Sequence, residues 1–132
     1  MTKCASATKG GKTILLVDDD DYVRDVAERI LRRAGYDLLC AANGKEALQI
    51  YKREQDNIAL VILDLVMPQM GGKECLQELL KINPAVNVVI STGASADDEL
   101  KEAVKKHTKG VVSKPYEIKE LLQAVQAALE KN

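Results

Sequence analysis

Short runs of consecutive apolar residues recur along this chain, and they constrain its fold more than any other feature. The runs cover residues 14–17, 36–41, 60–63, 86–90 and 110–113. Most of them are continuous rather than alternating, which is typical of strands buried on both faces of a sheet. Such strands belong to parallel sheets whose two faces are covered by helices.

Amphipathic stretches separate these runs, with apolar residues spaced three and four apart. They cover residues 23–34, 47–51, 76–80, 100–104 and 118–129, and the stretch at 100–104 is the weakest. Gly35 and Pro84 follow two of them as stop signals, and Asn43 stands where it can cap a third. The alternation predicts five βα units in an α/β fold, a doubly wound five-stranded parallel sheet, without giving the strand order.

Length and charge limit the classes of function. The chain has 132 residues, enough for one domain, with 46% hydrophobic and 30% charged residues and a formal net charge of −1. A net charge so close to zero gives no overall electrostatic attraction to nucleic acid or to an anionic membrane. No apolar run approaches the roughly 20 residues that span a bilayer. We therefore expect no direct nucleic-acid contact and no membrane association.

The N-terminus and the cysteines suggest a cytoplasmic protein. Residues 1–12 contain no apolar segment of the kind found in a secretory signal. We expect residues 1–11 to be a flexible leader and residues 12–132 to form the domain. The three cysteines, Cys4, Cys40 and Cys75, include no CxxC pair, so we expect free thiols in a reducing compartment.

Polar residues follow the predicted strands at the positions where α/β sheets bind ligands. Asp18 and Asp19 follow the first run, Asp64 ends the third, Thr92 follows the fourth and Lys114 follows the fifth. Ligands of open α/β sheets bind beyond the carboxyl ends of the strands, so these side chains should share one edge. Crowded carboxylates repel one another, and Mg²⁺ relieves that repulsion while accepting phosphate oxygens as further ligands.

The same residues suit phosphoryl transfer, which needs positioning and neutralisation of charge. A carboxylate can act as the nucleophile and form an aspartyl phosphate. The ammonium group of Lys114 and the hydroxyl group of Thr92 can bind phosphoryl oxygens. The pattern thus indicates a phosphorylation site that depends on a divalent cation.

Four motifs that contain these residues resemble the receiver domains of two-component response regulators. They are Leu-Val-Asp-Asp-Asp-Asp-Tyr-Val-Arg at 16–24, Asp-Leu-Val-Met-Pro-Gln-Met-Gly-Gly at 64–72, Ser-Thr-Gly at 91–93 and Lys-Pro at 114–115. The resemblance covers about residues 12–130, and all four motifs occur in order at strand ends. It implies a flavodoxin-like (βα)5 fold with strand order 2-1-3-4-5.

The resemblance also assigns roles at the metal site. It makes Asp64 the phosphoacceptor. Asp19, Asp64 and the backbone carbonyl of Val66 would bind Mg²⁺ directly, with Mn²⁺ as an alternative ion. Asp18 would act through a bound water.

Further roles concern the phosphoryl group and its readout. Thr92 and Lys114 would contact the phosphoryl oxygens, and the Lys114–Pro115 bond would be cis. Val111 departs from the family, because many receivers carry an inward-rotating aromatic residue there. The usual aromatic readout of phosphorylation is therefore not expected in this chain.

The resemblance implies a signalling role in a His-Asp phosphorelay rather than a turnover enzyme. The donor would be a phosphohistidine on a histidine kinase or phosphotransfer domain, and the domain would assist its own phosphorylation and dephosphorylation. An unidentified output partner, or a second copy in a homodimer, would use the face formed by helix 97–106, strand 110–113 and helix 118–129. Both a stand-alone receiver and a piece of a longer regulator fit the sequence.

Several residues have simpler interpretations. Asp20 and Asp21 stand at a helix start, where capping and the helix dipole alone favour carboxylates. We interpret Arg24 as a residue of the helix surface. His107 is interpreted as a solvent-exposed side chain and not as a phosphohistidine.

Three other functions are compatible with parts of the pattern. A degenerate receiver would only bind partners, although the complete acidic set argues against it. An aspartate-based phosphohydrolase could use Asp18 and Asp20, but such enzymes usually need a cap and a longer chain. A flavodoxin-type cofactor binder shares the fold class, yet four aspartates after the first strand would repel a phosphate.

Overall fold

The computed structural model describes residues 12–93 and 98–130, and these form ten elements. The strands are β1 (Thr13–Val17), β2 (Asp37–Ala41), β3 (Ile58–Asp64), β4 (Val88–Thr92) and β5 (Gly110–Ser113). The helices are α1 (Asp21–Arg33), α2 (Gly44–Glu54), α3 (Gly72–Ile82), α4 (Asp98–Lys105) and α5 (Ile118–Glu130). The predicted leader, 1–11, lies outside the described residues, so the proposed boundary at residue 12 stays a prediction.

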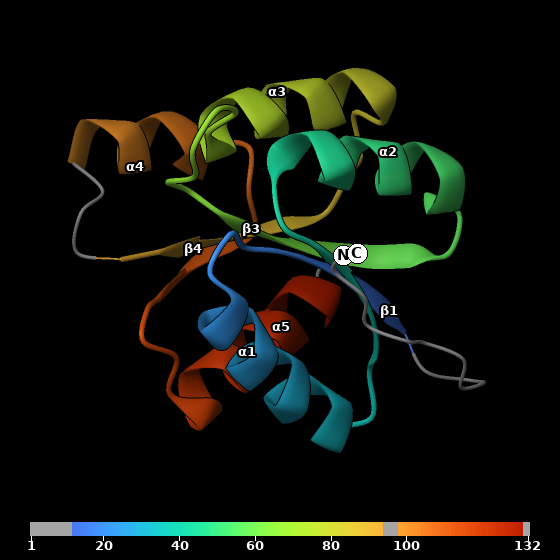
Figure 1. The fold of residues 1–132 in the computed structure, drawn as a ribbon, viewed down its shortest axis with the longest axis vertical. Coiled ribbons are helices and arrows are strands. Elements are labelled where there is room, and N and C mark those ends of the chain that lie inside the picture. The colour runs from blue at the N-terminus through green and yellow to red at the C-terminus, as the bar shows by residue number, and fades with distance from the viewer. Residues whose placement is uncertain (1–11, 94–97, 131–132) are drawn as a thin grey trace.

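The sheet confirms the predicted fold class and strand order. All four neighbouring pairs are parallel, and the order is β2-β1-β3-β4-β5. Helices α1 and α5 cover one face of the sheet, and α2, α3 and α4 lie on the other (Figure 1). From β1 the chain passes to β2 on one side, and from β2 it crosses to β3 on the other side of β1. The carboxyl ends of β1 and β3 therefore border the point at which the strand order reverses, and open α/β sheets bind ligands there.

Each face of the sheet packs into its own apolar core, which explains why the strand sequences are continuously apolar. The core on the side of α2 and α3 contains Leu15, Val17, Val61, Leu63, Val88 and Ile90. The core on the side of α1 and α5 contains Ile14, Leu16, Leu60, Ile62, Val89 and Val112. Alternate residues of one strand thus enter opposite cores, and both sets must be apolar.

Side-chain caps fix the start of two helices. The carboxylate of Asp20 accepts hydrogen bonds from the backbone N–H groups of Tyr22 and Val23, which confirms its capping role. Asn43 accepts from the N–H of Glu46 at 2.8 Å, and the Glu46 side chain accepts from the N–H of Ala42. Such caps satisfy N–H groups that have no partner within the helix.

The structure differs from the predicted boundaries at β4. The apolar run predicted a strand at 86–90, whereas β4 begins at Val88 and ends at Thr92. Val86 instead closes a turn by donating from its N–H to the carbonyl of Asn83. The later end places Ser91 and Thr92 inside the sheet, where they pair with Asp64 and Ser113.

The cysteines only partly follow the expectation of free thiols. Cys75 is buried and free. Cys40 is disulfide-bonded, so the expectation is wrong for that residue. Cys4 lies outside the described part of the chain.

We predict that the substitution Gly72→Ala lowers the free energy of unfolding by about 1–3 kcal/mol, because a Cβ there overpacks the backbone. That atom would lie 2.6 Å from both the Asp64 carbonyl oxygen and the Leu65 Cα. Gly44→Ala is the matched control at another helix start. Its Cβ would meet only the flexible Met70 side chain, at 2.8 Å from Sδ. Denaturant unfolding should show a clearly smaller loss for Gly44→Ala, and equal losses would contradict this account.

Candidate phosphorylation and metal site

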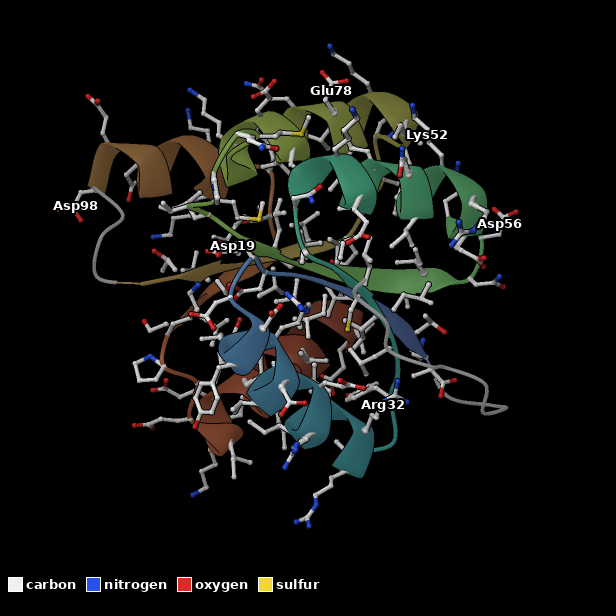
Figure 2. All side chains as sticks on the ribbon, viewed as in Figure 1. Asp19, Arg32, Lys52, Asp56, Glu78 and Asp98 are labelled. Atoms are coloured by element: carbon white, nitrogen blue, oxygen red, sulfur yellow. The ribbon has the colours of Figure 1, made fainter. Side chains whose placement is uncertain are left out.

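The sheet brings the predicted acidic residues and the lysine together at one edge. Asp18 directly follows β1, Asp64 is the last residue of β3, and Lys114 directly follows β5. Asp18 and Asp64 are buried, at 0% and 2% exposure, whereas Asp19 is exposed. Figure 2 shows Asp19 where the chain leaves β1 for α1.

Lys114 bridges the two buried carboxylates. Its Nζ donates a hydrogen bond to Asp18 Oδ2 at 3.3 Å. The same atom lies 3.1 Å from Asp64 Oδ2 as an ion pair, although the angle of that contact does not satisfy hydrogen-bond geometry. With 18% of its side chain exposed, Lys114 is largely withdrawn from water. The ammonium group therefore compensates part of the negative charge that the sheet edge buries.

Arg24 is the residue that the sequence interpretation placed wrongly. It is 9% exposed, and one guanidinium nitrogen donates to the carbonyl oxygen of Asp18 at 2.6 Å. A second nitrogen forms an ion pair with Asp21. Arg24 thus ties the first turns of α1 to the backbone that carries the acidic pair. The position of Arg24 in the acidic motif could have indicated that it belongs to the site. Its position on an amphipathic helix does not show which way its long side chain turns.

Burial and charge together set the ionisation of this site. Burial raises the pKa of Asp64 to about 7, with a further increase from Asp18 and an opposing effect from Lys114. Burial also acts to lower the pKa of Lys114, but the carboxylates of Asp18 and Asp64 outweigh it and raise that pKa above its ordinary value. At neutral pH Lys114 is charged, while Asp64 exists in both protonation states.

The carboxylates fit a divalent cation with hard-ion chemistry. Asp18, Asp19 and Asp64 each offer an oxygen, and these atoms lie within 4.8 Å of one another. Asp64 Oδ2 is buried without a hydrogen bond. Mg²⁺ prefers one or two carboxylates and keeps several waters, and a partly exposed edge provides both. Four residues were predicted at the metal site, and the structure brings the side chains of three of them together, namely Asp18, Asp19 and Asp64.

The other two predicted residues flank this cluster. The N–H of Val66 donates to Asp64 Oδ1 at 3.3 Å, and Val66 is 45% exposed. Thr92 is 5% exposed, and its hydroxyl group donates to the Gly93 carbonyl at 3.3 Å. In the described residues, no hydrogen bond joins the Thr92 hydroxyl to a carboxylate. The Lys114–Pro115 bond is cis, as expected, and His107 is exposed.

We predict that Asp64 makes the metal-free protein less stable as the pH rises. Its folded pKa of about 7 exceeds the ordinary value of 3.8, so between these two pH values the folded state holds a proton that the unfolded state releases. The contribution of Asp64 to the free energy of unfolding is largest below about pH 4, decreases as the pH rises, and is lost above about pH 7. At pH 8, Asp64→Asn should raise the free energy of unfolding by about 1–3 kcal/mol.

Denaturant unfolding at pH 5 and pH 8 without divalent cations checks this prediction. The control is Asp56→Asn, an exposed aspartate in the turn before β3 (Figure 2). It should keep the wild-type pH dependence. If the free energy of unfolding of Asp64→Asn also kept the wild-type pH dependence, Asp64 would not have a raised pKa in the folded protein.

Comparison with known proteins identifies relatives of two lengths. The chain is 35% identical over 127 residues to the sensor kinase CckA of Brucella abortus, covering 96% of this chain but 13% of the kinase. It is 31% identical to the chemotaxis protein CheY of Thermotoga maritima, covering 87% of this chain and 95% of CheY. The chain thus spans a small part of the first relative and nearly all of the second.

A solved structure and a family model agree with this result. A chain of the CheX–CheY–BeF3–Mg²⁺ complex from Borrelia burgdorferi superposes with a TM-score of 0.80 at 30% identity, with 87% of each chain covered. The model of the response regulator receiver domain matches residues 14–126, which include every residue of the acidic cluster. The chain therefore belongs to the response regulator receiver domain family, whose members act as phosphoacceptors in two-component signalling.

Proposed function

We propose that Asp64 is the residue on which this domain accepts its phosphoryl group. The observation that carries the proposal is the burial of Asp64 at the carboxyl end of β3, beside Asp18 and 3.1 Å from the Lys114 ammonium. Asp18 is equally buried, but Lys114 and the N–H of Asp20 both donate to its carboxylate. Within the described residues, Asp64 accepts one hydrogen bond, from the N–H of Val66, so its carboxylate is less engaged and is the better placed nucleophile.

The chemistry requires an ionised Asp64 and a phosphohistidine donor. One carboxylate oxygen attacks the phosphorus, a P–O bond forms, and the P–N bond breaks with its electron pair returning to the imidazole. Lys114 then exchanges its carboxylate contacts for a phosphoryl oxygen, and the Thr92 hydroxyl donates to another. Both residues stabilise charge on the group being transferred.

A Mg²⁺ ion, with Mn²⁺ as the alternative, is part of the proposal. Asp19, Asp64 and the Val66 carbonyl would bind it directly, and Asp18 would bind it through a water. When bound, the ion neutralises carboxylate charge and binds phosphoryl oxygens. Support comes from the clustered oxygens of Asp18, Asp19 and Asp64 and from the Mg²⁺ in the name of the Borrelia complex.

The partners follow from the same role. The donor is a histidine kinase or a phosphotransfer domain, and the phosphorylated state changes the α4–β5–α5 face that an output partner or a second copy reads. The CheX–CheY complex supports a protein partner for the domain, without indicating a face. We place the domain in the cytoplasm, where a kinase domain can reach it. No helix in the described part of the chain has the length and apolarity to cross a membrane.

The domain is a signalling component, and we propose that it assists only the gain and loss of its own phosphoryl group. A phosphohydrolase would instead turn over small phosphate esters many times. Assays with such an ester should therefore release no phosphate. Repeated turnover would favour the enzymatic alternative.

The experiment that tests the proposal is intact-mass spectrometry after incubation with acetyl phosphate. Wild type should gain one phosphoryl group in the presence of Mg²⁺ and none after chelation. Asp64→Asn should gain none, whereas Asp56→Asn should behave like wild type. A folded wild-type protein that gains no group would support the degenerate receiver, and a modified Asp64→Asn would move the site elsewhere.

A second prediction concerns competition between Lys114 and the metal ion. The ammonium group of Lys114 holds Asp18 and Asp64, so its removal should strengthen Mg²⁺ binding by about three- to tenfold. Calorimetry on Lys114→Ala measures this change. Lys109→Ala removes an equal but exposed charge and is the control. Unchanged or weaker binding in Lys114→Ala would show that the two cations do not compete.

A further inference from the structure

Buried polar atoms without partners gather beside the phosphoacceptor. Within the described ranges, four buried side-chain atoms lack a hydrogen bond: Asp64 Oδ2, Asn87 Oδ1, Ser91 Oγ and Tyr116 Oη. Such atoms are uncommon, because a buried polar atom left without a hydrogen bond destabilises the folded state. Three of these four belong to Asp64 and to two hydroxyl groups that the roles above do not use.

Ser91 is the direct neighbour of Asp64 in the sheet. The two residues are register partners in β3 and β4. Paired residues of adjacent strands project from the same face about 4.8 Å apart. That face is the one toward α1 and α5, since Ile62 and Val89, each two residues earlier, pack in that core. The Ser91 hydroxyl can rotate and donate in any staggered direction.

Tyr116 approaches the same place from the segment between β5 and α5. Burial raises the pKa of Tyr116, the carboxylates of Asp18 and Asp64 raise it further, and only the Ser91 hydroxyl lowers it. Tyr116 therefore stays protonated at neutral pH and can donate a hydrogen bond. Its hydroxyl group is close enough to Ser91 to interact, although the two make no hydrogen bond of good geometry.

Tyr116 also lines a surface hollow. This hollow has a volume of about 220 Å³ and is lined by Tyr22, Val23, Val26, Pro115 and Tyr116. It lies between α1 and the segment that precedes α5. Tyr116 thus connects the interior beside the carboxylates with the surface.

We propose that Tyr116 and Ser91 form a hydroxyl chain that ends on Asp64 and reports its state to this hollow. Tyr116 donates to Ser91 Oγ, and Ser91 donates to Asp64 Oδ2. A small rotation of the two hydroxyl groups pairs all three buried atoms. Both residues are positioning residues, because neither touches the phosphorus. The proposal rests on Asp64 being the phosphoacceptor.

Phosphorylation changes the acceptor at the end of this chain. The Asp64 carboxylate becomes an uncharged acyl group, and hydrogen bonds to charged acceptors are about twice as strong as those to neutral ones. The chain weakens, so the Tyr116 ring changes its position in the hollow. Since Val111 offers no aromatic ring on β5, this chain gives the domain another aromatic readout.

The first test uses the unphosphorylated protein. Tyrosine is labelled with ¹³C at Cζ, and the Tyr116 signal is assigned by its loss in Tyr116→Phe. Ser91→Ala should shift that signal, because the Tyr116 hydroxyl loses its partner. Ser113→Ala removes an exposed serine hydroxyl from the adjacent strand and should leave the signal in place. A Tyr116 signal that is the same in Ser91→Ala and wild type would overturn the hydroxyl chain.

The second test adds acetyl phosphate and Mg²⁺ and records mass and spectrum together. We expect a phosphoryl adduct on wild type, Ser91→Ala and Tyr22→Phe. The Tyr116 signal should move on phosphorylation in wild type and in Tyr22→Phe, and this movement should be lost in Ser91→Ala. An adduct without movement in wild type, or equal movement in Ser91→Ala, would refute the readout. Absence of any adduct would refute the proposed function instead, and the first test would still decide the hydroxyl chain.

Discussion

The ion pairs of Lys114 with Asp18 and Asp64 bring buried charge to the carboxyl edge of a sheet whose strands are mostly apolar. Burying two carboxylates together is unfavourable, and one ammonium group compensates only part of it, so the pKa of Asp64 remains raised. The two apolar cores hold the strands in a register that does not let these groups separate. A divalent cation would relieve this repulsion, because it neutralises carboxylate charge beside Asp18 and Asp64.

The sequence predicted the architecture well, because a doubly covered parallel sheet has a simple signature. Continuous apolar runs mean two buried faces, and both cores use alternate residues of the same strands. The predicted strand boundaries were wrong where apolar residues belong to turns, as Val86 does before β4. The strand order came from the family resemblance, since alternation of strands and helices does not contain it. The disulfide at Cys40 was not predicted, because cysteine spacing alone does not reveal a pairing.

The candidate site was predicted by position rather than by geometry. Residues at strand ends converge in any open α/β sheet, so Asp18, Asp64 and Lys114 could be grouped before their distances were known. Arg24 was misplaced because its side chain turns back toward the Asp18 carbonyl, which helical periodicity does not encode. Ser91 and Tyr116 were missed because a serine within a strand and a tyrosine after Lys-Pro carry no signal of their own. Only the register of β3 with β4 places Ser91 beside Asp64.

The central claim is that the phosphoryl group resides on Asp64, and locating that group chemically tests it most directly. An acyl phosphate on an aspartate is reduced by borohydride to homoserine, which peptide mapping assigns to one position. The account predicts homoserine at position 64 of the Mg²⁺-treated, phosphorylated protein and unmodified aspartate at positions 18 and 19. Homoserine at either of those two positions, or a phosphoryl group that resists reduction because it sits on another side chain, would contradict it.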